Sequence, residues 1–256
     1  MNATNSKPIQ SVQRAIDILN CFEPACPSLS IAEISEKTGL HINTTRGLIN
    51  TLVANHLLVR NEETMAYSLG LYFLGKSELL RSNTESYIAL FKPYIDRIAE
   101  NFHCSSSLQI VNQNEVFSIY CAYPSNRAYY IVLSEFTQLP LHATSSGKLL
   151  LLDQYERFGD TVLEKIKYTP YTLQSIRNAK SLKSQLDNIK KIGYSIELEE
   201  YAYDVGSIAI PIYSADGNLI LTISATAFAK NLVSIRAELV AELKKAVLLL
   251  MFAPLT

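Results

Sequence analysis

The stretch that decides the fold is "TGLHINTTRGLINTL", Thr38–Leu52. A glycine turn precedes apolar residues at spacings of three and four, which predicts an amphipathic helix over residues 42–54. One face of that helix should pack inward, and it carries Thr45, Leu48, Ile49 and Leu52. The opposite face should be exposed, and it carries Asn43, Arg46, Gly47 and Asn50. A tight turn followed by such a helix is typical of a helix-turn-helix unit that enters a DNA groove.

Two further helices and a β-hairpin are predicted around this stretch. The first helix covers residues 11–22 and is followed by "EPACPS", whose two prolines end it. The second begins at Ser30, which forms a capping box with Glu33, and ends at a glycine. Downstream, strand-like runs at residues 57–60 and 65–69 lie on either side of a polar turn. Three helices followed by a hairpin indicate a winged helix-turn-helix arrangement.

Positive charge is scarce around the third helix. The formal net charge of the whole chain is −1. In the first 75 residues the basic side chains are Lys7, Arg14, Lys37, Arg46 and Arg60. The acidic ones in that region are Asp17, Glu23, Glu33, Glu36, Glu62 and Glu63. This balance gives no bulk attraction to a polyanion and counts against nucleic-acid binding. The helix-turn-helix spacing alone is equally compatible with a DNA-binding unit and with a small helical unit whose outer face is solvated.

The remainder of the chain predicts a second, mixed region. Helices are expected at residues 70–82, 84–102, 179–192 and 232–252, with another beginning near Ser145. Strands are expected at residues 107–111, 116–122, 128–133, 193–200, 207–213 and 219–227. The last two strands flank "ADGN", which is typical of a hairpin turn. The region is therefore of the α+β class, with a largely antiparallel sheet covered by helices.

Composition excludes several other classes of protein. A hydrophobic content of 48% and a charged content of 18% are ordinary for a globular chain, not a disordered one. The N-terminus lacks a signal-peptide core, and the longest apolar run, residues 246–255, is too short to span a bilayer. Cys21, Cys26, Cys104 and Cys121 have no metal-ligand spacing. We expect a cytoplasmic protein with reduced, mostly buried thiols, no metal, no cofactor and no membrane partner.

The segment "HATSSGK" invites two enzymatic interpretations. A phosphate-binding loop requires glycine where His142 stands and Ser or Thr where Leu149 stands, so that motif fails. Ser145 and Lys148 have the Ser-x-x-Lys spacing of some acyl enzymes, but no Lys-Thr-Gly segment accompanies them. The alternatives are a structural helix start, with small residues allowing close backbone approach, or a helix start whose amides attract a carboxylate.

Two predicted strands carry alternating polar residues. In "GYSIELEEY", Ser195, Glu197 and Glu199 share one face, for which a solvent-exposed face and a functional one are equally open. In "LILTISATA" the hydroxyl side chains recur at every second position, namely Thr222, Ser224 and Thr226. A hydroxyl row in an apolar strand favours a small polar cavity. Tyr129 and Tyr130 are candidates for a pocket wall, with core packing as the commoner alternative.

These segments resemble the isocitrate lyase regulator (IclR) family of bacterial transcription factors. The resemblance rests on "SVQRAIDILNCF", "SLSIAEISEKTGL", "LINTL", "YSLG", "LPLHATSSGKLLL", "GYSIELEE" and "IAIPIYSADGNLILTISATA", in the family's order and spacing. It implies a winged helix-turn-helix DNA-binding domain at residues 1–70, a linker helix at 71–84 and a GAF-like effector-binding domain at 85–256. It also implies a homodimer or homotetramer that binds a double-stranded DNA operator under the control of a small organic acid.

The resemblance and the helix faces together supply the candidate site residues. For the ligand, carry-over from the family's pocket yields Ser145, Ser146, Glu197, Ser207, Ser224 and Thr226, with apolar walls at Leu139 and Val205. For DNA, the candidates are Arg14, Ser30, His41, Asn43, Thr44, Arg46, Asn50 and Arg60. In a dimer each contact is present twice, and helix starts and polar side chains hold phosphates without a full charge.

The chain departs from the family pattern at four positions. Gly47 stands where the family usually has an arginine, and Ala66 stands where the wing often has a basic residue. Near the pocket, Asp204 replaces a usual glycine and Glu197 a commoner aspartate. We expect a DNA-binding regulator, repressor or activator, and not an enzyme. The alternative is a ligand-binding or scaffold protein whose degenerate helix-turn-helix serves dimerisation only. Operator, target genes and effector are not determined by the sequence.

Overall fold

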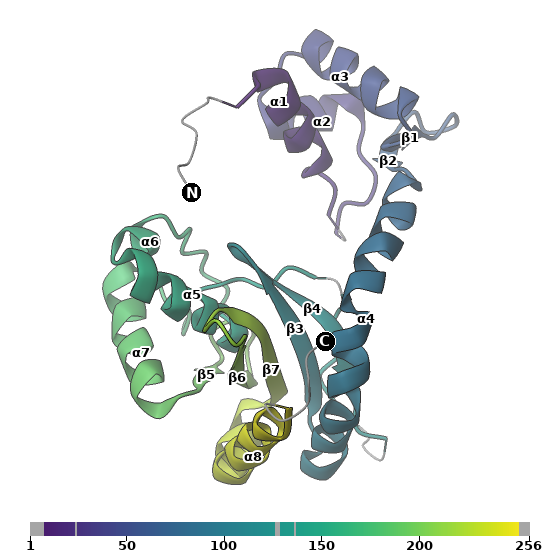
Figure 1. Ribbon diagram of the computed structural model, residues 1–256. Coiled ribbons are helices and arrows are strands. Elements are labelled where there is room, and N and C mark those ends of the chain that lie inside the picture. The colour runs from purple at the N-terminus through teal and green to yellow at the C-terminus, as the bar shows by residue number, and fades with distance from the viewer. Residues whose placement is uncertain (1–7, 24, 126–128, 136, 251–256) are drawn as a thin grey trace. The chain divides into compact units, whose positions relative to one another are not determined.

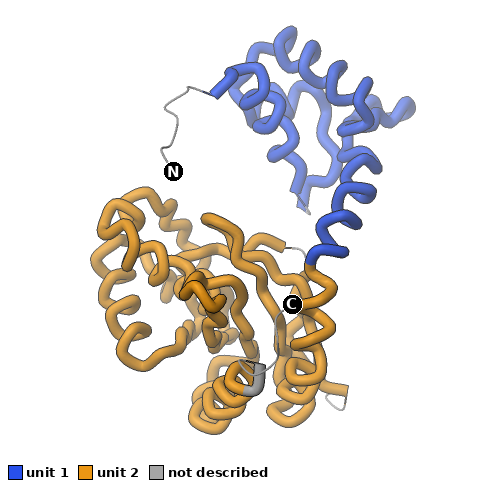
Figure 2. Tube along the Cα trace, viewed as in Figure 1, with its two compact units in different colours: residues 1–83 blue, residues 84–256 orange. Residues whose placement is uncertain are grey.

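The structure is a computed structural model that describes residues 8–23, 25–125, 129–135 and 137–250. It contains two compact units, residues 1–83 and 84–256, which are coloured separately in Figure 2. In the described residues no helix is long and apolar enough to cross a membrane. The same residues hold no cluster of His, Cys, Asp and Glu side chains suited to a metal ion.

The first unit is a three-helix winged unit, as predicted. It consists of α1 (Gln10–Leu19), α2 (Ile31–Thr38), α3 (Ile42–Ala54), β1 (Leu58–Arg60) and β2 (Tyr67–Leu69), with the two strands antiparallel (Figure 1). The Ser30–Glu33 capping box begins α2, and Gly39 ends it in a left-handed conformation with φ of 67°. That conformation is easy only for a residue without Cβ, so this glycine makes the tight turn into α3 possible.

The core of the first unit confirms the predicted inner face of α3. Thr45, Ile49 and Leu52 are buried, and Leu48 packs against the same core from a half-buried position. The other helices contribute Ile18 from α1 and Ile34 from α2, and the hairpin contributes Leu58 and Tyr67. Burying this stripe removes apolar surface from water, which holds the three short helices together. The opposite face of α3 remains open to solvent.

Helix α4 (Tyr72–Phe102) is one continuous helix of 31 residues that passes from the first unit into the second (Figure 2). The sequence predicted two helices, at residues 70–82 and 84–102, and that break is wrong. Neither glycine nor proline occurs between residues 76 and 92, so nothing in the chain interrupts the backbone ladder there. The C-terminal part of α4 buries Phe91, Ile95 and Ile98 in the second unit.

A five-stranded antiparallel sheet forms the second unit, with the order β4-β3-β7-β6-β5. Its strands are β3 (Ser105–Asn112), β4 (Glu115–Ala122), β5 (Ser195–Leu198), β6 (Val205–Tyr213) and β7 (Leu219–Phe228). One face packs against α4 and α8 (Ala229–Leu250). The other face is covered by α5 (Ser145–Phe158), α6 (Thr161–Glu164) and α7 (Ala179–Ile192) (Figure 1). The predicted α+β class and helix-covered antiparallel sheet are confirmed.

Residues 129–133 are not a strand, contrary to the prediction for 128–133, and Ala128 lies outside the described residues. Side chains hold this segment in place of a backbone ladder. The Tyr123 hydroxyl donates to the carbonyl of Leu133 (2.6 Å), and the Ser105 hydroxyl donates to the carbonyl of Ile131. The apolar run at residues 129–133 therefore belongs to a segment outside the sheet. At the C-terminus α8 begins earlier than predicted, and its expected end at Phe252 lies outside the described residues.

Candidate functional site: a polar cavity and an exposed helix face

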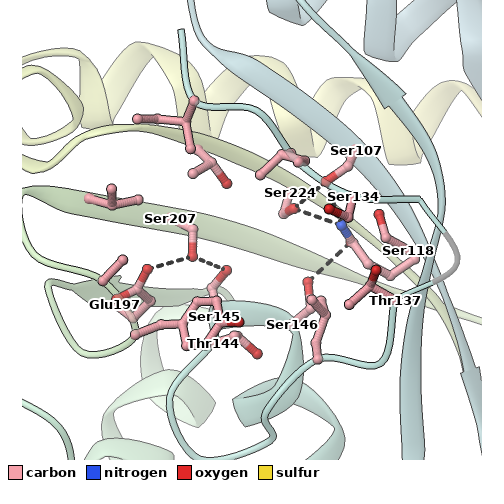
Figure 3. A pocket seen from close by; sticks show the side chains of 18 of the residues that line it. Ser107, Ser118, Ser134, Thr137, Thr144, Ser145, Ser146, Glu197, Ser207 and Ser224 are labelled. Atoms are coloured by element: carbon pink, nitrogen blue, oxygen red, sulfur yellow. Dashed lines mark hydrogen bonds between the residues drawn. The ribbon is translucent and has the colours of Figure 1, made fainter. Parts of the chain in front are cut away.

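A cavity of about 280 Å³ lies in the second unit, beside the first turn of α5 and against β3, β6 and β7. Its lining also includes Ser118 of β4, Glu197 of β5, residues 131–134, Thr137, Leu139, Tyr201 and Ala202. Hydroxyl groups dominate its polar lining and come from Ser107, Ser118, Ser134, Thr137, Thr144, Ser145, Ser146, Ser207, Ser224 and Thr226 (Figure 3). All eight ligand-binding candidates from the sequence line this one cavity.

The first turn of α5 is held against the cavity by close backbone packing. The Thr144 hydroxyl caps the helix by accepting the N–H of Gly147 (3.1 Å). A Cβ on Gly147 would lie 2.5 Å from the backbone of Leu141, so glycine is required for this approach. The amides of Ser145 and Ser146 belong to the first turn, where a helix offers no internal acceptor. A helix start of this kind is suited to an anion.

Strand alternation brings the hydroxyl row of β7 to the cavity. Ser224 and Thr226 line it, whereas Ile223 and Ala225 face the core formed with α4 and α8. Register then adds the neighbouring strands, since Ser107 pairs with Ser224 and Ser207 with Thr226. The predicted polar cavity along this strand is confirmed by these positions. Thr222 lies one step deeper and is fully buried.

Gln109 is the centre of a buried hydrogen-bond network that was not predicted from the sequence. Its amide nitrogen donates to the hydroxyls of Ser107 (2.6 Å) and Ser224 (2.9 Å). Its amide oxygen accepts from Ser146 (3.1 Å) and Thr222 (2.8 Å). Both amide hydrogens and both acceptor positions of the Gln109 side chain are therefore used in hydrogen bonds. Polar alternation in "SSSLQIVN" was the available signal, of the same kind as the hydroxyl row in β7.

Glu197 is buried, so the solvent-face alternative for its strand is wrong. Its side chain is 4% exposed, and Ser195 on the same face is fully buried. One carboxylate oxygen accepts from the Ser207 hydroxyl (3.0 Å), and the other accepts from the Glu200 amide (3.0 Å). Burial raises the pKa of Glu197 to about 7, against the lowering effect of these bonds and of Lys148.

Lys148 is engaged away from Ser145, which removes the acyl-enzyme interpretation. Its ammonium group is fully buried and donates to Glu200 (2.8 Å), Gln185 (2.8 Å) and the carbonyl of Ile196 (3.0 Å). Three donors meet three acceptors, so no hydrogen of the ammonium group remains for a serine. Lys148 instead ties α5 to α7 and to the end of β5.

Asp204, at a usual glycine position of the family, adopts a left-handed backbone with φ of 60°. Aspartate is among the residues that tolerate this conformation best after glycine. Its carbonyl accepts the N–H of Ala229, which anchors the start of α8 next to the cavity wall. Tyr129 and Tyr130 are exposed, so neither packs in the core.

The outer face of α3 carries the predicted DNA candidates in exposed positions. His41, Asn43, Thr44, Arg46 and Asn50 are all exposed. A Cβ on Gly47 would meet no atom within 4 Å, so this face has open space at its centre. The remaining three candidates are more constrained. Arg14 and Arg60 are half-buried, with Arg60 beside Tyr67 in the wing, and the Ser30 hydroxyl is bonded to Glu33.

Each of the two units matches a model of the same protein family. The model of the bacterial transcriptional regulator IclR C-terminal domain matches residues 84–250, and that of the IclR helix-turn-helix domain matches residues 11–62. The HTH-type transcriptional regulator XynR of Escherichia coli K12 is 26% identical over 217 residues, which cover 84% of this chain and 85% of XynR.

Solved structures share the fold at low sequence identity. A putative IclR regulator from a Silicibacter species superposes with a TM-score of 0.79 at 20% identity and covers 94% of each chain. An IclR homologue from Microbacterium hydrocarbonoxydans, crystallised with 4-hydroxybenzoate, has a TM-score of 0.70 at 21% identity, covering 93% of this chain and 96% of its own. The two family models together match most of the chain, which therefore belongs to the IclR family of bacterial transcriptional regulators.

Proposed function

We propose that this member of the family changes its affinity for operator DNA when a small organic acid occupies the cavity at the start of α5. One observation carries the proposal: the first-turn amides of α5 and a group of serine and threonine hydroxyls lie at the same cavity of about 280 Å³. Amides at a helix N-terminus suit a carboxylate, and the hydroxyls suit a second polar group on the ligand.

The size and lining of the cavity favour a hydroxy acid, a keto acid or an aromatic acid. Leu139 and Val205 provide apolar wall, whereas Ser207, Ser224 and Thr226 provide polar contacts. A relative that was crystallised with 4-hydroxybenzoate supports an aromatic acid as one candidate. A dianion lying against Glu197 is disfavoured, because the carboxylate of that residue would repel it when ionised.

The first unit supplies the DNA contacts in this proposal. Arg46 is the cation on the outer face of α3, where it is suited to a guanine edge or a phosphate. We assign residues 1–70 to DNA binding, 71–84 to the linker and 85–256 to effector binding. An acid that prefers the DNA-competent or the DNA-incompetent conformation then shifts operator affinity by the difference between its two affinities.

Association into a homodimer or homotetramer is part of the proposal. Leu74, Leu79 and Leu80 in the first half of α4 are exposed, as are Val12 and Ile16 of α1. Exposed apolar side chains on these helices favour contact with a second copy of the chain. Light scattering after size exclusion measures the state directly, and a monomer at micromolar concentration would contradict this part.

The test of ligand control is a thermal-shift screen of organic acids, followed by operator binding. The parent is compared with Ser146→Trp, whose indole should fill the cavity, and with Ser234→Trp on an exposed position of α8 as the control. We expect an acid to raise the Tm of the parent and of the control but not of Ser146→Trp. An acid that stabilises all three equally binds elsewhere, and the cavity assignment would be wrong.

A scaffold with a degenerate helix-turn-helix is the second candidate, favoured by Gly47 and by the low positive charge of residues 1–75. A binding assay with DNA from upstream of the protein's own gene distinguishes the regulator from the scaffold. Specific binding in the presence of competitor DNA supports the regulator, and its absence, with or without the stabilising acid, supports the scaffold.

A further inference from the structure

A chain of three buried groups joins Glu197 to the start of α5. Glu197 Oε1 accepts the hydroxyl of Ser207 (3.0 Å), and Ser207 Oγ lies 2.8 Å from Ser145 Oγ (Figure 3). A serine hydroxyl has a single hydrogen, and that of Ser207 points at the carboxylate. The hydrogen between the two serines must therefore come from Ser145. While Glu197 is ionised, both hydroxyl hydrogens are engaged within the chain and neither is free for a ligand.

In that state the start of α5 is poorly suited to an anion. Ser145 presents only lone pairs to a ligand, although its own backbone amide and that of Ser146 are suited to a carboxylate. The negative charge of Glu197 lies two hydrogen bonds away in a buried environment, where electrostatic repulsion is screened less than in water. A ligand carboxylate at the start of α5 is therefore attracted by the amides of Ser145 and Ser146 and repelled by the carboxylate of Glu197.

Protonation of Glu197 reverses the chain. The second carboxylate oxygen, Oε2, already accepts the Glu200 amide, so an added proton belongs on Oε1, next to Ser207. The acid then donates to Ser207, Ser207 donates to Ser145, and the hydrogen of Ser145 is released toward the cavity. One proton thus removes the repelling charge and adds a donor beside the helix amides.

The charged groups around Glu197 leave this protonation accessible. Lys148 approaches from α5 and Glu200 from the end of β5, but these two form an ion pair of 2.8 Å with each other. The ammonium group of Lys148 has no hydrogen left for Glu197. With that pair largely self-neutralised, burial dominates and raises the pKa of Glu197 to about 7.

We propose that the cavity binds a carboxylate ligand together with one proton, which Glu197 takes up from solvent and keeps. The protonated carboxyl group donates to Ser207, so that Ser207 donates to Ser145 and the hydroxyl hydrogen of Ser145 becomes available to the ligand. The charge balance is simple: one anion and one proton enter, and the net charge of the site is unchanged. Glu197 is a positioning residue that acts on the ligand through the two serines. This inference rests on the proposed effector function and makes effector binding depend on pH.

The test uses matched pairs of small probes on the full-length protein at pH 6 and pH 8. Benzoate and glycolate are the acids, and benzamide and glycolamide are their neutral counterparts. Isothermal titration in two buffers of different ionisation enthalpy measures the protons taken up per ligand. With a free-state pKa of about 7, the protonated fraction falls about tenfold from pH 6 to pH 8. We expect about tenfold weaker binding of the acid at pH 8, with uptake there of nearly one proton per site.

Glu197→Gln is the decisive variant, because its amide oxygen can accept the Glu200 N–H while its NH₂ donates to Ser207, as the protonated acid would. It should bind the acid equally well at both pH values, without proton uptake. Glu199→Gln is the control, since it removes the same charge two residues away, outside the cavity lining. The control should keep the pH dependence and proton uptake of the parent.

The outcomes separate this inference from the proposed function. Acid binding without proton uptake, or with equal affinity at both pH values, overturns the inference and leaves effector binding intact. Amides that bind while the acids do not also overturn it. If neither acids nor amides bind at either pH, the proposed effector class is wrong and the inference fails with it.

Discussion

At the scale of single residues, a substitution of Arg46 tests whether α3 binds DNA. Its side chain is exposed on α3, and it is the lone basic residue between residues 42 and 54. Arg46→Ala should weaken operator binding by about 1–3 kcal/mol, the range for a bidentate base contact, with an unchanged Tm. Fluorescence anisotropy measures the affinity. Arg177→Ala, an exposed position of the second unit, is the charge-matched control. Equal affinities of Arg46→Ala and parent at about 150 mM salt would contradict the role.

Two substitutions at Gly47 distinguish the effect of added charge on DNA binding from the effect of a more stable α3. A side chain there meets open space, so arginine fits without strain. Gly47→Arg should bind DNA more tightly and steepen the salt dependence by roughly 2 in a dimer, at about 0.9 per phosphate contact and subunit. Gly47→Ala is the control, because it gains about 1 kcal/mol of helix propensity without a charge. A slope shared by all three proteins would mean that α3 does not enter the groove.

Lys148 has a structural role, and its removal should destabilise the folded protein. Lys148→Met leaves Glu200 buried without its cation, for which a loss of about 3–5 kcal/mol in unfolding free energy is expected. Lys183→Met breaks the exposed pair with Asp160 and should leave the denaturation midpoint nearly unchanged. Urea unfolding followed by circular dichroism measures both. A similar small effect for the two variants would show that the buried pair contributes little.

At the scale of elements, the approach of α5 to the preceding loop positions the cavity. Gly147→Ala would place a methyl group 2.5 Å from the backbone of Leu141, and backbone cannot move aside as a flexible side chain can. We expect a lower Tm and loss of the thermal shift by the acid. Gly75→Ala is the matched control in α4, where the added Cβ meets nothing within 4 Å and should stabilise the helix by about 1 kcal/mol. Retained ligand stabilisation in Gly147→Ala would show that this close approach is dispensable.

The elements also differ in how far their sequences determined them. Helix α2 was predictable to the residue because the Ser30–Glu33 box and Gly39 act through bonds within a few residues. Helix α3 was equally predictable from its apolar spacing. The predicted break within α4 was wrong, and so was the predicted strand over the described residues 129–133. Polar residues in a long helix and apolar residues in a loop resemble other elements when neighbours are ignored.

At the scale of the molecule, the low positive charge predicts a weak salt dependence of DNA binding. Arg14, Arg46 and Arg60 offer three candidate ionic contacts per subunit. If a dimer uses all of them, the slope of log K against log salt should be roughly −5. Titrations of operator DNA between about 50 and 200 mM salt measure it. A slope near zero would favour the scaffold alternative, and a slope near −10 would require contacts beyond these arginines.

Some residues of the cavity lining were predictable from the sequence, and others were not. The sequence placed Ser224 and Thr226 on one strand face, and the family pattern added Ser145, Ser146 and Ser207, all of which line the cavity. Gln109 was absent from that set, although it bonds three hydroxyls of the cavity lining and that of Thr222 below them. Its membership depends on the register of β3 against β7, a pairing of residues more than 100 positions apart.

By itself the sequence determined the local elements, the winged helix-turn-helix and the polar face of β7, because these follow from spacing, capping and alternation over a few residues. Tertiary structure alone decided that Glu197 is buried rather than solvated, and that Lys148 points at Glu200 rather than at Ser145. Alternation states which side chains share a face but not what covers that face. Burial, and with it the raised pKa of Glu197, depends on segments distant in the chain, which only the folded sheet and its helices bring together.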